Sequence, residues 1–183
     1  MTAPACTLVT WGREDLSAHR DDVLDVYADA MAVDRRAARA RRSILTAHLD
    51  RDGLRALAAV DGRRRLVGVA YGYLGAAGQW WHDQVRAALT VEQSQRWLEG
   101  AFEVCELHVR PPWQGHGLGR GLLDGLLAGV PARTAVLTTP DLESRARGFY
   151  RAQGWVDLVR DLVFPGDPRS FAVLAKDLTP HAG

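Results

Sequence analysis

The stretch that decides the fold runs from Glu103 to Arg120 and reads EVCELHVRPPWQGHGLGR. Side chains alternate in character over 103–109, which predicts a β-strand that ends at Pro111-Pro112. A glycine-rich turn follows over 114–119, and the sequence continues as LLDGLLAGV, which predicts a helix. A glycine turn that leads into a helix leaves several backbone N–H groups without partners at the positive end of the helix dipole. The stretch therefore predicts a site for a phosphate or pyrophosphate group.

Two common phosphate-binding motifs do not fit this turn. The dinucleotide fingerprint requires Gly-x-Gly-x-x-Gly, but its last position is Arg120 when counted from Gly115 and Leu122 when counted from Gly117. The nucleoside-triphosphate loop requires Gly-Lys-Ser/Thr, and the only lysine of the chain is Lys176. The turn therefore matches neither the dinucleotide motif nor the nucleoside-triphosphate motif.

The turn instead reads Gln114-x-x-Gly117-x-Gly119 after the strand pattern Leu107-x-Val109. With its strand before it and its helix after it, it resembles the pyrophosphate loop of the GNAT superfamily of acyl-CoA-dependent N-acyltransferases. A second segment, GFYRAQGW over 148–155, is similar to the family's FY-x-x-x-GF segment, with Trp155 in place of phenylalanine. The resemblance covers nearly the whole chain.

Composition bounds the class of protein. The chain has 183 residues, 47% of them hydrophobic and 25% charged, which is ordinary for one globular domain spanning 1–183. A net charge of +1 gives no global field that favours nucleic acid or an anionic membrane. With only Cys6 and Cys105, we expect no structural disulfide and a reducing cytoplasm. We expect neither a signal peptide in the first 15 residues nor a membrane span, because no apolar run approaches the ~18 residues that a span needs.

The periodicity predicts a mixed order of elements. We expect strands at 8–11, 54–60, 66–74, 103–109, 135–139, 155–164 and 171–178, and helices at 17–32, 34–49 and 79–98, after the glycine turn, and after Pro140. Expected helix caps are Asp34, Thr90 in a capping box, Thr139 or Asp141, and Gly154 at a C-terminus. The fold class is α/β (α+β). By the resemblance it is a mixed, mostly antiparallel sheet of about seven strands flanked by helices, with a helical insert before the central strand.

Two clusters leave alternatives open. The arginines at 35–42 fit a solvated helix face better than a nucleic-acid patch, because the total charge is balanced. Trp80, Trp81 and Trp97 lie in the predicted insert. They fit equally well as anchors of that insert on the core and as a wall of a substrate pocket.

The resemblance implies acetyl-CoA as co-substrate and assigns the residues that hold it. The strand before the turn would pair its backbone with the pantetheine arm, as an added strand would, and the turn would hold the pyrophosphate. The cofactor-binding residues implied in this way are Leu107, His108, Val109, Gln114, Gly115, His116, Gly117, Leu118, Gly119 and Arg120. No His/Cys cluster has metal-ligand spacing, so we expect no metal.

Amine acetylation also needs a general base and an acid for the leaving thiolate. The central strand offers Glu103 and Glu106, which lie an odd number of residues apart and so point to opposite faces. Family spacing from Gln114 favours Glu103, with Glu106 in reserve if a bulge changes the parity, and His108 as a third candidate. Tyr150 matches the family's acid, since a phenol can give a proton to a thiolate of similar basicity.

The predicted activity is direct transfer of an acetyl group from acetyl-CoA to a primary amine of a small molecule or peptide. The alternatives are transfer of a longer acyl group or transfer to a hydroxyl, and a catalytically silent CoA-binding sensor of the same fold. We expect no nucleic-acid or membrane partner, and family habit implies a homodimer. The acceptor region would comprise 28–36, 75–83 and 164–170, where Tyr27, Trp80 and Trp81 offer aromatic faces.

Overall fold

The computed structural model of the protein describes residues 5–179. Contacts between residues divide the chain into two compact units. The first unit contains the chain up to Tyr73 together with Val104–Val130, and the second contains Leu74–Glu103 and the chain from Pro131 onward. The chain passes from the second unit back into the first within one strand, between Glu103 and Val104.

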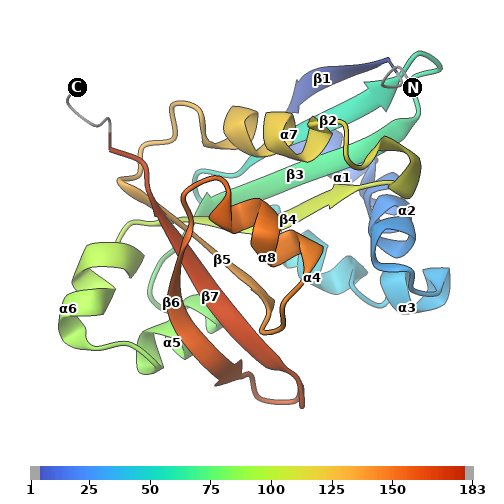
Figure 1. Cartoon of the computed structure of the whole chain (residues 1–183). Coiled ribbons are helices and arrows are strands. Elements are labelled where there is room, and N and C mark those ends of the chain that lie inside the picture. The colour runs from blue at the N-terminus through green and yellow to red at the C-terminus, as the bar shows by residue number, and fades with distance from the viewer. Residues whose placement is uncertain (1–4, 180–183) are drawn as a thin grey trace. The chain divides into compact units, whose positions relative to one another are not determined.

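Seven strands form one hydrogen-bonded sheet in the order β1-β2-β3-β4-β5-β7-β6 (Figure 1). Their bounds are β1 Cys6–Trp11, β2 Arg55–Asp61, β3 Leu66–Leu74, β4 Phe102–Val109, β5 Thr134–Pro140, β6 Val156–Val163 and β7 Ser170–Asp177. The pairs β1–β2, β2–β3, β5–β7 and β6–β7 are antiparallel, whereas β4 runs parallel to β5. This confirms the prediction of a mixed, mostly antiparallel sheet of about seven strands.

Helices occupy most of the connections between strands. They are α1 Arg13–Ala18, α2 Arg20–Met31, α3 Arg35–Arg39, α4 Arg42–His48, α5 Trp80–Ala87, α6 Val91–Gln93, α7 Leu118–Leu127 and α8 Arg145–Arg151, with a π-helical turn η1 Ser94–Leu98 and a 3-10 turn η2 Pro111–Trp113. Within the described part of the chain, none of these helices combines the length and apolar character that crossing a bilayer requires.

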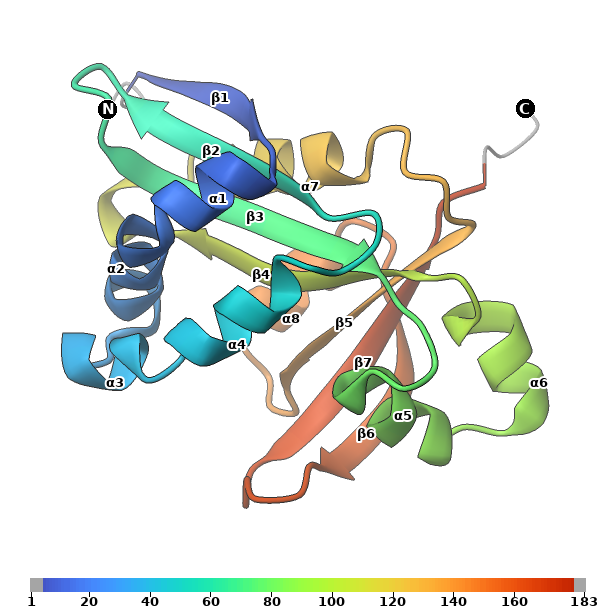
Figure 2. The same ribbon diagram turned by 180° about the vertical axis from the view of Figure 1, so that it is seen from behind.

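In the first unit, alternation along the strands sorts side chains onto two faces. Ala56 and Ala58 of β2, with Val69 and Tyr71 of β3, form a core with residues of α1, α2 and α4. Leu57, which lies between the two alanines, faces α7 on the other side. Figure 2 shows α1 and α7 on opposite faces of β2 and β3. The period-2 pattern therefore gives a layer of helices on each face.

Two glycines let α7 approach the sheet closely. A Cβ atom on Gly125 would lie 2.5 Å from Leu57 Cδ2, and one on Gly68 would lie 3.0 Å from Leu122 Cδ1. The apolar face of α7, which includes Leu118, Leu122 and Leu126, is buried. This packing fixes the axis of α7, and with it the position of the helix N-terminus after β4.

The second unit builds its own core between β5, β7 and the helical insert. Val85, Leu98 and Ala101 of the insert pack with Val136 of β5 and Val173 of β7. Trp81 Nε1 donates to Thr138 Oγ1 at 2.6 Å, and Thr134 Oγ1 donates to the carbonyl of Trp97 at 3.0 Å. Trp81 and Trp97 therefore act as anchors of the insert. Trp80 is 56% exposed and lies against Phe164 with ring centroids 5.5 Å apart.

Several predicted boundaries are confirmed. The Asp34 carboxylate accepts from the Arg36 N–H at 2.7 Å at the start of α3. Thr90 and Gln93 form the predicted capping box, with bonds of 3.0 and 3.1 Å, and α5 ends before it. The turn after α8 contains Gly154 with φ +80°, which only glycine adopts without strain.

Three helix predictions are wrong in their limits. The segment 17–32 is divided between α1 and α2 near His19, and the segment 34–49 is divided between α3 and α4 at Ala40–Arg41. The helix predicted from Pro140 begins only at Arg145, because Pro140 still belongs to β5. Its cap is Ser144, whose Oγ accepts from the Arg147 N–H at 3.2 Å.

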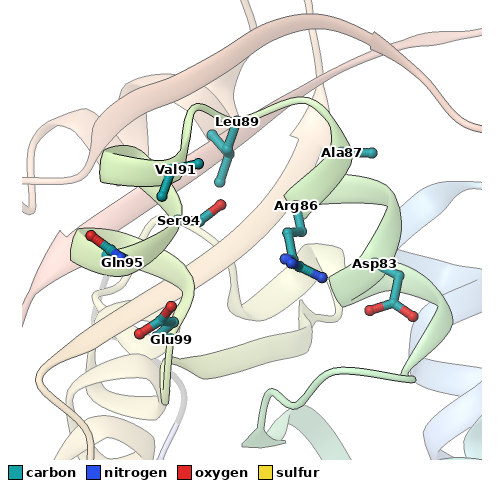
Figure 3. A pocket seen from close by; sticks show the side chains of 8 residues that line it. All are labelled: Asp83, Arg86, Ala87, Leu89, Val91, Ser94, Gln95 and Glu99. Atoms are coloured by element: carbon teal, nitrogen blue, oxygen red, sulfur yellow. The ribbon is translucent and has the colours of Figure 1, made fainter.

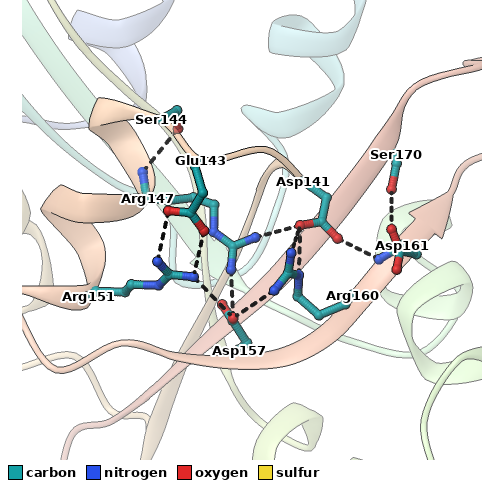
Figure 4. Close-up of polar contacts among 9 residues, drawn as sticks. All are labelled: Asp141, Glu143, Ser144, Arg147, Arg151, Asp157, Arg160, Asp161 and Ser170. Atoms are coloured by element: carbon teal, nitrogen blue, oxygen red, sulfur yellow. Dashed lines mark hydrogen bonds and ion pairs between the residues drawn. The ribbon is translucent and has the colours of Figure 1, made fainter.

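Asp141 does not cap a helix because ion pairs with Arg147 and Arg160 engage its buried carboxylate (Figure 4). Arg147 Nη1 lies 2.5 Å from Asp141 Oδ1, and both side chains have no exposed surface. The second Arg147 amino group binds Asp157 at 2.6 Å, and Arg160 Nε donates to Asp141 at 2.7 Å. The Asp161 N–H completes the set at 2.7 Å. These contacts tie the start of α8 to β6 within the second unit.

Replacing Asp141 by alanine should lower the free energy of unfolding by about 3–5 kcal/mol, because it leaves the buried Arg147 guanidinium short of a partner. Glu143→Ala is the matched control, since Glu143 pairs with Arg151 in the same network but is 74% exposed. It should cost about 1 kcal/mol or less. Urea unfolding measures both, and equal losses would contradict the ranking.

The same carboxylate predicts a pH dependence. A hydrogen bond from Arg160 lowers the pKa of Asp141 from 3.8 to about 2, although burial opposes this shift. The Asp161 N–H and the charge of Arg147 act in the same direction as Arg160. A lowered carboxyl pKa stabilises the fold fully above the unfolded value and loses its effect as the pH falls through the folded one. The free energy of unfolding, measured between pH 5 and pH 2, should therefore fall more steeply with decreasing pH below pH 4. The Asp141→Ala variant should lack part of this fall.

Candidate functional site

The glycine turn forms the N-terminus of α7 in the described structure. Gly115 and Gly117 have φ angles of +81° and +80°, and Gly117 is the N-cap of α7. The first intrahelical bond of α7 runs from the Gly121 N–H to the Gly117 carbonyl at 3.0 Å. The three N–H groups before Gly121 therefore lie ahead of the first helical hydrogen bond. This is the arrangement that binds anions at helix N-termini.

The turn is fastened to the strand that leads into it. Gln114 Nε2 donates to the carbonyl of Val109, the last residue of β4, at 2.8 Å. Arg110 is tied to β3 through its N–H to Val67, at 2.8 Å, and its Nε to Leu66, at 2.9 Å. The Gln114 side chain thus closes the loop, and an anion would meet backbone N–H groups there.

The turn is also open to solvent. Gly115, His116, Gly117 and Arg120 are exposed, while Leu118 is buried beneath them. A Cβ atom on Gly117 would meet no atom within 4 Å. The glycine is therefore required by its positive φ angle and leaves room at the helix N-terminus for a ligand.

Next to the turn in the same unit, β4 carries a buried acid–base pair. Glu106, whose side chain is 13% exposed, binds His108 Nε2 through Oε2 and the Arg41 guanidinium through Oε1. Burial alone would raise the pKa of Glu106. The hydrogen bond and charge of His108, together with Arg41, outweigh it and lower that pKa from 4.5 to about 2. Glu106 is therefore an ionised acceptor of two hydrogen bonds throughout the neutral range.

Aromatic rings surround this pair on the helical side. The Tyr27 ring of α2 meets His108 edge-on, with centroids 5.1 Å apart, and the Arg41 guanidinium lies 4.6 Å from the centre of the same ring. A cavity lined by Tyr27, Tyr71, Arg41, Glu106 and His108 retains about 10 Å³, about the room that one water molecule needs.

A second histidine, His48, contacts Tyr71. The Tyr71 hydroxyl and His48 Nδ1 are 3.1 Å apart. Burial raises the pKa of Tyr71 well above 10, so its hydroxyl keeps its proton and donates. Burial lowers the pKa of His48 to about 4, and the positive charges of Arg51 and Arg41 add to this against the opposing charge of Glu106. His48 is thus a packed histidine.

The remaining predicted residues belong to the second unit or to the end of the strand. Glu103 is buried and pairs with Val136 across the parallel β4–β5 ladder. Tyr150 lies half-buried on α8, with its ring 5.1 Å from Phe149 and 5.7 Å from Trp155. Val109 is buried at the end of β4, and Leu107 is half-buried. The structure thus brings together Glu106 and His108, which sequence reasoning ranked second and third.

The second unit contains a hollow of about 340 Å³ in the helical insert (Figure 3). Its lining includes the charged residues Asp83, Arg86 and Glu99 and the apolar residues Leu89 and Val91. Asp83 accepts from the Gly78 N–H at 3.1 Å, and this bond holds the turn before α5. No group of three or more potential metal ligands occurs in residues 5–179.

Sequence reasoning missed the role of Arg41. It treated the arginines of 35–42 as one solvated face, and most of them do pair with aspartates of α2: Arg35 with Asp25 and Asp29, Arg39 with Asp25, Arg42 with Asp21. Arg41 instead reaches β4, because the helix divides at Ala40–Arg41 and changes the direction of the side chain. The apolar period of the segment gives no signal of that division.

Comparison with known proteins agrees with this fold. Residues 20–155 match the acetyltransferase (GNAT) family, and the chain belongs to that family. It is 34% identical to a GCN5-like protein acetyltransferase of Mycobacterium tuberculosis, over 95% of this chain and 98% of the relative.

Two solved structures share the fold at low identity. A GNAT-family acetyltransferase of Staphylococcus aureus superposes with a TM-score of 0.65 at 14% identity, over 96% of this chain and all of that one. The ribosomal-protein-S18-alanine N-acetyltransferase of Escherichia coli superposes with a TM-score of 0.60 at 13% identity, over 98% and 97% of the two chains. The chain is therefore a member of the GNAT acetyltransferase family and shares its fold.

The low pKa of His48 gives a testable titration. Because the folded pKa of about 4 lies below the ordinary 6.5, the fold loses stability as the pH falls from about 6.5 toward 4. The His48→Gln variant should flatten the dependence of the unfolding free energy on pH in this window. Proton NMR of the His48 ring should show a midpoint near 4 in the wild type; a midpoint at 6 or above would contradict its placement against Tyr71.

Proposed function

We propose that the protein transfers an acetyl group from acetyl-CoA to a primary amine of a small molecule or peptide, by direct attack of the amine on the thioester. The observation that carries this proposal is that two features lie next to each other along the chain in the first unit. An open helix N-terminus follows directly from the strand that holds the buried Glu106–His108 pair. Family membership supports acetyl transfer as the reaction.

The chain's own groups account for cofactor binding. The N–H groups at the start of α7, in the Gln114–Arg120 turn, would bind the pyrophosphate. Backbone groups of Leu107, His108 and Val109 would pair with the pantetheine arm in the manner of an added strand. An N–H of the same strand would donate to the thioester oxygen, and one such donor is typically worth about 3 kcal/mol in the transition state.

Proton transfers complete the reaction. The amine nitrogen bonds to the thioester carbon, the C–S bond breaks, the amine proton goes to the general base, and Tyr150 protonates the leaving thiolate. With a pKa of about 2, Glu106 is a weak base at neutral pH. It suits a positioning role, since it holds His108 by Nε2 and leaves Nδ1 as the ring nitrogen that would accept a proton. We therefore propose His108 as the base, with Glu103 as the alternative.

The peptide class of acceptor has one independent support. The 34%-identical relative is named as a protein acetyltransferase. An amine on a protein or peptide is accordingly the acceptor that we test first, followed by small primary amines. With only two cysteines, the chain fits the reducing cytoplasm that we propose as the location, and a homodimer stays a prediction from the family.

A CoA-binding sensor without turnover is the alternative function. It shares the α7 site but needs no base and no acid. Acetyl-CoA that binds without any acetylation of peptide or small amines, in wild type and variants alike, would favour the sensor.

Cofactor binding is tested at the two ends of α7. Gly117 and Gly129 both have positive φ angles, +80° and +67°, and open space around a new Cβ atom. Gly117→Trp and Gly129→Trp should therefore cost similar stability, but only Gly117→Trp should abolish acetyl-CoA binding in calorimetric titration. Loss of binding in both variants, or in neither, would contradict the placement of the pyrophosphate at the Gln114–Arg120 turn.

Catalysis is tested on the base and the acid. His108→Gln should lower kcat about 10²–10⁴-fold with acetyl-CoA affinity retained, because a general base contributes on this scale. Tyr150→Phe should lower kcat and leave the pH dependence of the base in place. Stopped assays of CoA release give both values. If Glu103→Gln causes the large loss and His108→Gln does not, then Glu103 is the base.

A further inference from the structure

The Glu106 carboxylate and the Tyr27 ring together make a cation site in the first unit. A carboxylate and the face of an aromatic ring are the two groups that proteins combine to bind ammonium and guanidinium ions. Here they converge on one point, since Arg41 contacts Glu106 and lies 4.6 Å from the centre of Tyr27. The apolar side chains of Val23 and Leu45 line the same cavity.

Arg41 fills this site without being part of its frame. It lies at the junction of α3 and α4, which are five and seven residues long, and its side chain is 37% exposed. The ion pairs that hold α3 and α4 against α2 come from Arg35, Arg39 and Arg42. Withdrawal of the Arg41 side chain would therefore leave these helices attached.

The two oxygens of Glu106 separate the roles of its partners. Arg41 binds Oε1, whereas His108 binds Oε2. A ligand cation that replaced Arg41 would meet Oε1 and the Tyr27 ring, and the bond between Glu106 and His108 would persist. The exchange would also keep the buried carboxylate paired, so the cost of leaving a buried charge alone would not arise.

We propose that Arg41 is an internal occupant of the acceptor's cation site, and that the site takes an ammonium or guanidinium group of the substrate when Arg41 withdraws. The proposal rests on the proposed function and names the class of its acceptor: a cationic amine. Arg41 then acts as a built-in competitor, because a ligand that binds only the open state has its apparent affinity reduced by the fraction of open molecules.

Methylguanidinium tests the site without acetyl-CoA. Arg41→Met keeps the length of the stem and removes the charge, so it should bind methylguanidinium about tenfold or more tighter than the wild type in calorimetry. Arg42→Met is the matched control, because Arg42 pairs with the exposed Asp21, and it should bind as the wild type does. N-methylurea, a neutral ligand of similar shape, should not bind. Equal binding of both ligands, or no gain in Arg41→Met, would overturn the proposal.

A measurement on the wild type covers the case in which Arg41→Met does not fold. The ¹⁵N resonance of Arg41 Nε should move toward that of a solvated arginine as methylguanidinium is added, while that of Arg110 stays in place. An Arg41 signal unchanged at saturating methylguanidinium would overturn displacement. Since neither readout needs turnover, cation binding without acetylation would refute the acetyltransferase proposal alone, and acetylation without cation binding would refute this inference alone.

Discussion

The buried carboxylate of Glu106 is the constraint on which the first unit depends. A charge at 13% exposure in the sheet needs partners, and the chain supplies Arg41 from the α3–α4 junction and His108 from the same strand. Together they outweigh the effect of burial and keep the pKa at about 2. The carboxylate thereby links the helical layer to the strand that ends at the glycine turn. A change in the protonation of Glu106 would act directly on His108, which is bonded to its Oε2.

The geometry of the turn follows from packing on the other face of the same strands. Gly125 on α7 and Gly68 on β3 allow the helix to lie close to Leu57 of β2 and to β3, and the leucines of α7 fill that contact. The helix axis is set by this apolar face, so its N-terminal N–H groups hold a fixed place after β4. Gln114 adds the last restraint by binding the carbonyl of Val109. The proposed anion site is made by backbone, and its side chains serve mainly to hold the backbone in shape.

The sequence predicts the elements whose signals are local. Alternation gave β3 at its observed limits and β4 to within one residue, and Asp34 and Thr90 mark helix starts by their capping chemistry. It does not predict the division at Ala40–Arg41 or the late start of α8, because both depend on contacts with distant residues. Asp141 reads as a cap in the sequence, yet Arg147 and Arg160 engage it in three dimensions. For the same reason the pairing of Glu106 with Arg41, 65 positions away, has no local signature.

The direct test of the account is the titration of the Glu106 side-chain carboxyl, followed by ¹³C NMR in the wild type and in Arg41→Met. With Arg41 and His108 both bound, the carboxyl resonance should stay that of an ionised group from pH 8 down to about 3. Loss of the Arg41 charge should raise the midpoint, because burial then acts against fewer positive partners. A wild-type midpoint at 4.5 or above, unmoved by the substitution, would mean that the carboxylate does not organise the site.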